Sequence, residues 1–303
     1  MSRMPKEPVK LVPVPSTNKI PERDIDKSPI LECRHLGIDF GGLAAVKDFN
    51  MAIGRTEIAG LIGPNGAGKT TVFNLLTKVY QPTRGTILVD GVDTHNMNTV
   101  QVNKAGIART FQNIRLFSNL SVEDNVKLGL HNHINYNMWS GILRLPRYWN
   151  AERLAHERAM ELLSIFDMGY LAKYKAGSLP YGDQRKLEIV RALATNPSLL
   201  LLDEPLSALD GVIKESIKDR IRTIAREYGL TTIIVTHDPE EALTLSDRVL
   251  IIDRGTISQY ARPEEIVHQP KNDFVRKFIL NQLEIKRDNI YALFGRPSVA
   301  AAV

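Results

Sequence analysis

The stretch that decides the fold of this 303-residue chain is residues 58–71, IAGLIGPNGAGKTT. Its first five residues form an apolar run typical of a buried parallel strand. Residues 63–70 then match the pattern G-x-x-x-x-G-K-[ST], and a helix is predicted from about Thr70 to Val79. Glycines let the backbone N–H groups of such a loop curl around phosphate oxygens, and the helix that follows turns its positive end toward the anion. The stretch therefore predicts a site for the phosphates of a nucleotide.

Two residues of this loop have separate expected tasks. Lys69 is expected to reach the β- and γ-phosphates of ATP, and the Thr70 hydroxyl to ligate Mg²⁺. A chance match to the pattern has odds of roughly one in a hundred in a chain of this length, and the preceding strand lowers them. We therefore expect ATP to contact the whole loop, that is Gly63, Pro64, Asn65, Gly66, Ala67, Gly68, Lys69, Thr70 and Thr71.

A pair of acids follows a second apolar run. Residues 199–202 are four leucines, and Asp203 and Glu204 come directly after them. A buried strand that ends in two carboxylates places them at the edge of the sheet, beside the phosphate loop. On this interpretation Asp203 holds Mg²⁺ through water, and Glu204 orients and deprotonates the attacking water. Two acids after an apolar run are also common at a plain strand end, so the pair is specific only together with the phosphate loop.

The rest of the chain is organised around these strands. Residues 232–235 form another buried run, and the alternation of strands and helices predicts an α/β core with a parallel sheet. Residues from about 121 to 174 have a helical period, so we expect a helical insertion at about 113–185. The domain is expected to span residues 30–280, after a disordered leader at 1–29 that holds six prolines and before a tail at 281–303.

Composition narrows the class of protein. Hydrophobic residues make up 43% and charged residues 24% of the chain, as in globular domains. The net charge of +5 is mild; it fits contact with anionic ligands or a membrane surface, but a solvated basic face is the simpler interpretation. A single cysteine, Cys33, excludes an internal disulfide framework, and no apolar stretch is long enough to cross a bilayer. A chain that serves a membrane with this composition is expected to do so through partners.

Residues 179–185, LPYGDQR, identify a family. They resemble the signature motif of ABC ATPases, and the YGDQR form is characteristic of the branched-chain amino acid importer ATPases. The other marks of the family are present in order: Phe40 stands at the position of the adenine-stacking aromatic, Gln112 matches the Q-loop, residues 207–210 match the D-loop, and His237 matches the switch histidine. The resemblance covers roughly residues 30–280.

The resemblance implies a fold and a catalytic unit. The fold is an α/β P-loop NTPase (RecA-like) core with an antiparallel β subdomain and an inserted α-helical subdomain. Two ATPase subunits face head to tail, and each nucleotide lies between the phosphate loop of one and the signature helix of the other. The implied catalytic residues are Glu204, His237 and Gln112; the Mg²⁺ ligands are Thr70, Gln112 and Asp203; and Phe40, Tyr181, Gly182, Asp183 and Asp210 join the phosphate loop in binding ATP.

The same resemblance implies partners and a place in the cell. The partners are integral membrane permease subunits, a second ATPase subunit that is identical or related, and, indirectly, an extracytoplasmic solute-binding protein. No nucleic acid is expected. The chain would act at the cytoplasmic face of the cell membrane, as a peripheral subunit of an importer.

Two departures from the family pattern bear on function. Pro180 stands where the signature motif usually has serine, and it offers neither a hydroxyl nor an N–H, so it is left out of the ligand set. Residues up to about 204 favour import of branched-chain or other apolar amino acids, whereas PLSALD, VTHDPEEAL and RPEEIVHQP further on resemble importers of polyamines, osmolytes or phosphonates. A soluble ABC ATPase acting on ribosomes or DNA, and a small-molecule kinase with a phosphate loop, are the other readings. The single phosphate loop disfavours the first, and the signature motif disfavours the second.

Overall fold

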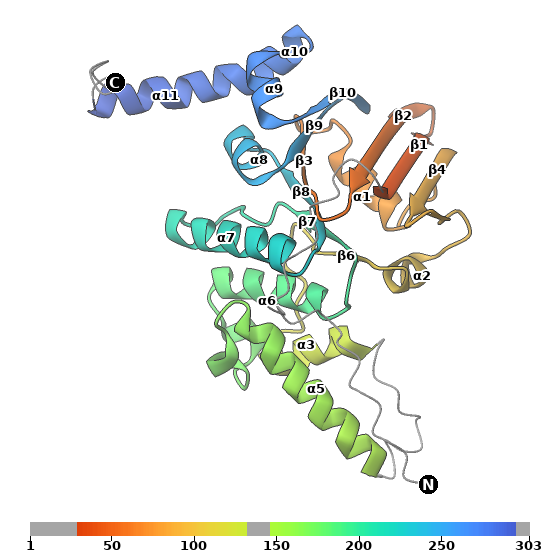
Figure 1. The fold of residues 1–303 in the computed structure, drawn as a ribbon, viewed down its shortest axis with the longest axis vertical. Coiled ribbons are helices and arrows are strands. Elements are labelled where there is room, and N and C mark those ends of the chain that lie inside the picture. The colour runs from red at the N-terminus through yellow and green to blue at the C-terminus, as the bar shows by residue number, and fades with distance from the viewer. Residues whose placement is uncertain (1–28, 132–145, 295–303) are drawn as a thin grey trace.

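A six-stranded sheet forms the centre of the molecule (Figure 1). The computed structural model describes residues 29–131 and 146–294. The strand order is β10-β9-β3-β8-β7-β6, in which the pairs from β9 to β6 are parallel and β10 is antiparallel to β9. The strands are β3 (Ile58–Ile62), β6 (Ile107–Arg109), β7 (Leu199–Asp203), β8 (Thr231–Thr236), β9 (Arg248–Asp253) and β10 (Thr256–Ala261). All residues of β3, β7 and β8 are buried, which explains their uninterrupted apolar runs.

A second, antiparallel sheet stands beside the first (Figure 1). Its order is β2-β1-β4-β5, with strands β1 (Pro29–Phe40), β2 (Leu43–Gly54), β4 (Arg84–Val89) and β5 (Val92–Asp93). The predicted α/β fold with an antiparallel β subdomain is thereby confirmed. Strand β1 begins at Pro29, the last residue of the predicted leader, and residues 1–28 lie outside the described residues.

Helix α1 (Lys69–Leu76) follows the phosphate loop and packs Val72, Phe73 and Leu75 into the core below the antiparallel sheet. It ends three residues before the predicted Val79. The reason is local, because Lys78 has a φ of 55°, a left-handed conformation that a helix does not continue through. Helix α2 (Thr99–Lys104) then leads into β6, and Asn98 and Gln101 close a capping box at its start.

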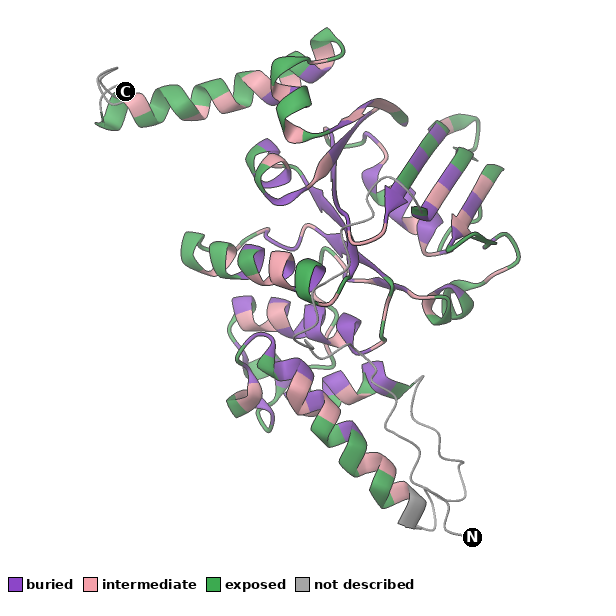
Figure 2. Ribbon diagram, viewed as in Figure 1, coloured by how far each residue is buried: buried purple, intermediate pink, exposed green. Residues whose placement is uncertain are grey.

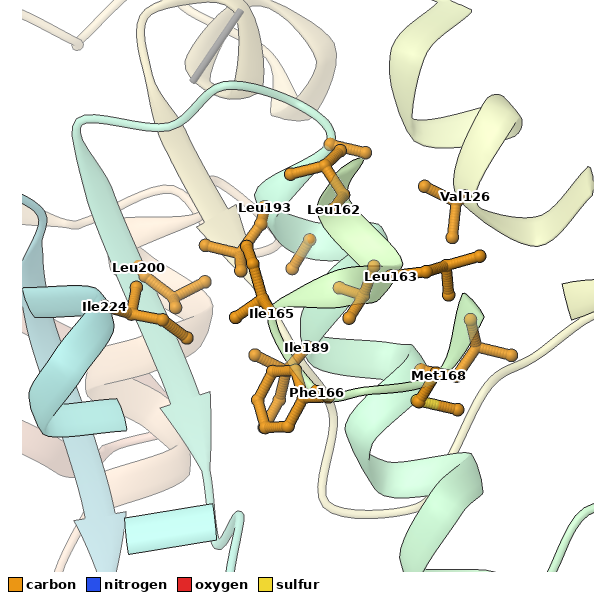
Figure 3. Close-up of a cluster of buried hydrophobic side chains, with 14 of the residues drawn as sticks. Val126, Leu162, Leu163, Ile165, Phe166, Met168, Ile189, Leu193, Leu200 and Ile224 are labelled. Atoms are coloured by element: carbon orange, nitrogen blue, oxygen red, sulfur yellow. The ribbon is translucent and has the colours of Figure 1, made fainter. Parts of the chain in front are cut away.

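A helical layer covers one end of the central sheet (Figure 1). It consists of α3 (Val122–Leu130), α5 (Pro146–Ser164), two short 3₁₀ turns at Gly169–Leu171 and Ala176–Ser178, and α6 (Tyr181–Leu193). Figure 3 shows its core, where Leu163, Phe166 and Ile189 pack with Leu200 of β7. The layer and the central sheet therefore share one hydrophobic cluster. Residues 132–145, which include Trp139 of the predicted insertion, lie outside the described residues.

The carboxy-terminal part adds further helices, of which the first packs into the same hydrophobic cluster as α5 and α6. They are α7 (Gly211–Glu227), α8 (Pro239–Leu245), α9 (Pro263–His268), α10 (Asp273–Val275), a π-helical turn (Arg276–Leu280) and α11 (Asn281–Phe294). Helix α11 occupies the described part of the predicted tail and projects from the body with most of its residues exposed (Figures 1 and 2). Within residues 29–131 and 146–294, none of the helices combines the length and the apolar character that a membrane span requires.

Candidate nucleotide-binding and hydrolysis site

The phosphate loop, residues 63–68, joins the end of β3 to the start of α1. Gly63 packs so closely on β9 that an added Cβ would lie 2.3 Å from the carbonyl oxygen of Ile252. Gly66 has a φ of 78° and faces open space, so its backbone can approach a ligand without a side chain between them. Gly63 therefore lets the loop pack against β9, and Gly66 leaves the backbone of the loop accessible to a ligand.

Lys69, at the first position of α1, turns its side chain back over the loop. Its Nζ donates to the carbonyl oxygens of Gly63, at 2.7 Å, and Pro64, at 3.0 Å. Burial lowers the pKa of Lys69 below its ordinary value, and the negative charges of Glu204 and Asp203 oppose that shift. The lysine is thus a partly desolvated cation that the two acids help to keep charged.

Asp203 is the last residue of β7 and is buried. Its Oδ2 accepts a hydrogen bond from Nη2 of Arg109, at 2.8 Å, and its backbone N–H donates to the Thr110 hydroxyl at 3.3 Å. Arg109 ends β6, the neighbouring strand, so the ion pair crosses the sheet edge where the strands finish. One carboxylate oxygen of Asp203 is held in this way.

Glu204 stands between two other predicted catalytic residues. Its φ of 47° turns the chain sharply after β7, and its backbone N–H donates to the carbonyl of Val235 at 3.0 Å. Its Oε2 accepts from Nε2 of Gln112 at 3.1 Å, and its Oε1 lies 3.6 Å from Nδ1 of His237. The structure therefore brings Glu204, Gln112 and His237 together, although they come from three segments of the chain.

A cleft of about 540 Å³ opens above the phosphate loop. Gln112 and Glu204 line one side of it, and Lys47 and Arg254 line another part. The loop residues that line it are Asn65, Gly66, Gly68, Lys69, Thr70 and Thr71. A space with backbone N–H groups, a buried lysine and a carboxylate at its edge can hold a polyphosphate and activate a water beside it.

A smaller cavity of about 110 Å³ lies on the other side of Glu204. His237 and Asp238 line it together with Ser207 and Ala208 of the predicted D-loop. The D-loop is tied to the acid, because the Ser207 hydroxyl donates to the backbone carbonyl of Glu204 at 2.9 Å. Glu204 thus lines two cavities, one with the phosphate loop and one with His237.

Some predicted ligand residues lie apart from the cleft. Phe40 is not among the residues that line it; its ring packs edge-to-face on Tyr80, with centroids 5.2 Å apart. Tyr181 and Asp183 stand in the first turn of α6, with the Asp183 carboxylate paired to Lys186 at 2.9 Å. Among the described residues that line the cleft, neither Tyr181 nor Asp183 is present.

The remaining two predicted ligands have local packing partners. Gly182 is buried, and a Cβ added there would lie 3.0 Å from two atoms of the Ile213 side chain. Asp210 caps α7 by accepting from the Ile213 N–H at 3.0 Å. Pro180 immediately precedes α6, and its carbonyl accepts from Asp183 and Gln184. The turn into α6 is therefore held by backbone hydrogen bonds, without a side-chain cap at Pro180.

The residues near the loop fit a small, hard cation. Mg²⁺ prefers oxygen ligands and retains waters or phosphate oxygens in most protein sites. Thr70 offers an exposed hydroxyl, and Asp203 has one carboxylate oxygen left beside the one that Arg109 engages. The amide nitrogen of Gln112 donates a hydrogen bond to Glu204, and the amide oxygen could coordinate a cation. These are the three oxygens that the predicted ligand set would use.

Two functional candidates were missed in the sequence. Arg109 lies in the stretch ARTFQ, three residues before Gln112, but a charged residue at a strand end gives no signal of burial. Arg185, in YGDQR, has no exposed side-chain surface and donates to the carbonyls of Phe111, at 2.7 Å, and Gln112, at 2.8 Å. Helix α6, which carries the predicted signature motif, therefore holds the backbone of the predicted Q-loop through Arg185.

The family model and the similar proteins agree on one family. Residues 46–207 match the family model described as ABC transporter. The high-affinity branched-chain amino acid transport ATP-binding protein BraF of Pseudomonas aeruginosa is 37% identical over 251 residues, 83% of this chain and 98% of that protein. LivG of Escherichia coli, with the same printed function, is 36% identical with the same coverage. The spermidine/putrescine import ATP-binding protein PotA of Clostridium acetobutylicum is 35% identical over 84% of this chain and 67% of that protein.

Solved structures share the fold. The ADP conformation of an ATP-binding cassette of an ABC transporter superposes with a TM-score of 0.71, over 82% of this chain and 98% of that chain, at 24% identity. A cassette solved as a dimer in a post-hydrolysis state, bound to ADP and Pi, superposes with a TM-score of 0.65 at 26% identity, over 77% of this chain and 98% of that one.

Proposed function

The chain belongs to the ABC transporter family of ATP-hydrolysing subunits, and on that premise we propose that it powers import of branched-chain or other apolar amino acids. The ATPase part of the proposal is carried by the meeting of Lys69, Glu204 and Gln112 at one cleft above a phosphate loop, and the substrate class is supported by the 37% and 36% identity to BraF and LivG. These residues bind and cleave a nucleoside triphosphate and contribute nothing to recognition of a transported solute. Choice of solute lies with the permease that the subunit joins.

In the proposed reaction the phosphate loop and Lys69 hold the β- and γ-phosphates of ATP. Glu204 takes the proton of the attacking water at a carboxylate oxygen. Gln112 and His237 stand at its two oxygens, 3.1 and 3.6 Å away, and orient the carboxylate toward the cleft. Thr70, Gln112 and Asp203 would hold Mg²⁺, which supplies charge neutralisation for the phosphates when bound.

The working unit is proposed to contain two ATPase subunits. Tyr181 and Asp183 are at the start of α6 and outside the cleft of their own chain, although the family places the signature motif on a nucleotide. A second subunit facing head to tail would supply its α6 to this cleft. A solved relative of the fold is itself described as dimeric. A single chain should therefore hydrolyse ATP slowly.

Permease contact is assigned to the helical layer and the Q-loop, at the cytoplasmic face of the cell membrane. Exposed aromatic side chains gather in this region, including Phe117, 56% exposed, and Tyr174, 58% exposed. Exposed apolar area of this kind is typical of interfaces. The surface lies in the part of the sequence that resembles branched-chain amino acid importer ATPases, which supports that substrate class and an extracytoplasmic solute-binding protein as an indirect partner.

Uptake of leucine tests the proposal. A bacterial strain lacking its own branched-chain importer ATPase is supplied with this chain and its permease, and radiolabelled leucine uptake is measured. We expect uptake with the wild-type chain and none with Glu204→Gln, which controls for hydrolysis. Because PotA-like proteins are 35% identical over most of this chain, spermidine uptake is measured in parallel. Rescue of spermidine uptake alone would move the substrate to polyamines.

A further inference from the structure

We propose that Lys286, on the carboxy-terminal helix α11, is a positioning residue for ATP hydrolysis: it braces Asp238 and so fixes the adjacent His237 beside Glu204. The inference rests on the proposed function and on the role that the family resemblance implies for a switch histidine, which is contact with the γ-phosphate of ATP; His237 would make that contact from its place 3.6 Å from Glu204. It adds a helix that lies beyond both the matched family region, residues 46–207, and the expected end of the ATPase domain at residue 280.

The contact joins two segments 48 residues apart. Nζ of Lys286 donates to both carboxylate oxygens of Asp238, at 2.9 and 3.0 Å, and to Oε2 of Glu240, at 3.0 Å. An ammonium group has three N–H donors, so each has an acceptor here. The lysine therefore spans the first turn of α8 from outside.

Asp238 in turn sets the path of the chain at His237. Its Oδ1 accepts from the Glu240 N–H at 2.9 Å and caps α8, while its own N–H donates to Thr236 Oγ1 at 3.1 Å. Thr236 Oγ1 donates to Glu241 at 2.5 Å, on the same helix. His237 therefore lies between two residues that are each held by hydrogen bonds to α8, so the backbone on both sides of it is fixed.

The charges around Asp238 agree with a brace. Burial alone would raise the pKa of Asp238, but Lys286 and the Glu240 N–H hold that pKa below its ordinary value. The carboxylate stays ionised and paired. The brace also comes from an element with few other attachments, since α11 is mostly exposed along its length (Figure 2).

Removing the brace should loosen His237 without closing the cleft. Lys286 lies outside both cavities of the site, so ADP should bind the Lys286→Ala chain as it binds the wild type. Preference for ATP over ADP should fall about two- to fivefold, the range expected when one partly exposed ion pair is lost. A side chain with only a structural role would weaken both nucleotides or neither.

The experiment compares variants in the full-length chain. Affinities for ATP and ADP are measured by displacement of a fluorescent ADP, with Glu204→Gln present to prevent hydrolysis. Lys286→Ala should lower the ATP preference, Lys286→Arg should restore it, and Arg287→Ala should leave it unchanged, because Arg287 pairs only with its neighbour Asp288 among the described residues. Equal loss in Lys286→Ala and Arg287→Ala, or no loss in either, overturns the proposal.

Asp238→Asn removes the same ion pair from its other partner. Asparagine caps helices as well as aspartate does, so the variant keeps the cap and loses the ion pair. It should match Lys286→Ala, and the double variant should show no further loss. Additive losses would overturn the brace, whereas normal ATP turnover in Glu204→Gln would instead refute the proposed hydrolysis site.

Discussion

The guanidinium of Arg109 lies 2.8 Å from a carboxylate oxygen of Asp203, and both side chains are more than 90% buried. The same guanidinium donates to Asn74 at 2.7 Å and stands over the rings of Phe73 and Phe111. Arg109 thus ties the end of β6 to α1 and to the acid at the end of β7. Because Gln112 follows three residues later, the pair links the proposed Mg²⁺ ligand to the Q-loop.

Arg109→Ala should destabilise the chain by about 3–5 kcal/mol, since it leaves the Asp203 carboxylate buried without its partner. Urea unfolding followed by circular dichroism measures the loss. Arg115→Ala is the matched control, because Arg115 is exposed and its guanidinium only covers the ring of Phe111. An unfolding midpoint for Arg109→Ala equal to that of the control would show that the ion pair does not hold Asp203.

Glu204→Gln should slow ATP turnover by on the order of 10²–10⁴ while ATP binding remains, because an amide cannot take the proton of the attacking water. Turnover is measured as phosphate release by the complex with its permease. Glu264→Gln, an exposed glutamate on α9, should turn over at the wild-type rate. Near-normal turnover in Glu204→Gln would place the base elsewhere.

Lys69→Ala should weaken ATP binding and hydrolysis together, because it removes the lysine that the phosphate loop holds. The pKa of Lys69 is lowered by burial, so its proton leaves at a lower pH than that of an exposed lysine. ATP affinity of the wild type should therefore fall as the pH rises toward that lowered value, and the affinity of Lys69→Ala should not follow. A binding titration across alkaline pH checks both, and identical pH curves would separate Lys69 from the phosphates.

Much of this architecture can be predicted from sequence because it depends on runs of neighbouring residues. Strands β3, β7 and β8 are buried on both faces, and burial on both faces produces the unbroken apolar runs that predict them. The end of α1 could not be predicted, because the left-handed turn at Lys78 has no marker such as glycine. The phosphate loop could be predicted as well, because its motif is a run of consecutive residues.

The contacts around the site are the part that sequence does not predict. Arg109 and Arg185 are buried charged residues that a pattern assigns to the surface, Lys286 stays partly exposed, and the partners of the three lie 94, 73 and 48 residues away. The fold supplies those partners, and only then does burial of a guanidinium become favourable.

Glu57→Ala should destabilise the chain by about 3–5 kcal/mol, since Glu57 is fully buried and anchors the strand that leads to the phosphate loop. Its carboxylate accepts from both Nε and Nη2 of Arg248, at 2.7 and 2.6 Å, and from the Tyr260 hydroxyl at 2.6 Å. These contacts join β3 to β9 and β10. Chemical unfolding measures the effect, and Glu32→Ala, which removes an exposed pair with Arg34, should leave stability nearly unchanged.

Helix α6 holds the backbone of the predicted Q-loop through Arg185. Arg185→Ala should destabilise the chain by about 3–5 kcal/mol, because Glu188, 2.8 Å from Nη1 of Arg185, would stay buried without its cation. Burial already raises the pKa of Glu188 above its ordinary value, and loss of Arg185 raises it further. A raised native pKa means that the folded chain binds a proton more tightly than the unfolded chain, so the deficit of the variant should shrink as the pH falls.

Replacing both partners separates stability from function. Arg185→Leu with Glu188→Leu leaves no buried charge and should regain most of the lost stability. The carbonyls of Phe111 and Gln112 would still lack their donor, so ATP turnover by the complex with its permease should remain low although the chain is folded. Unfolding at two pH values and phosphate release test both halves. Wild-type turnover in the double variant would mean that α6 supports the fold alone and that Gln112 is positioned by its contact with Glu204.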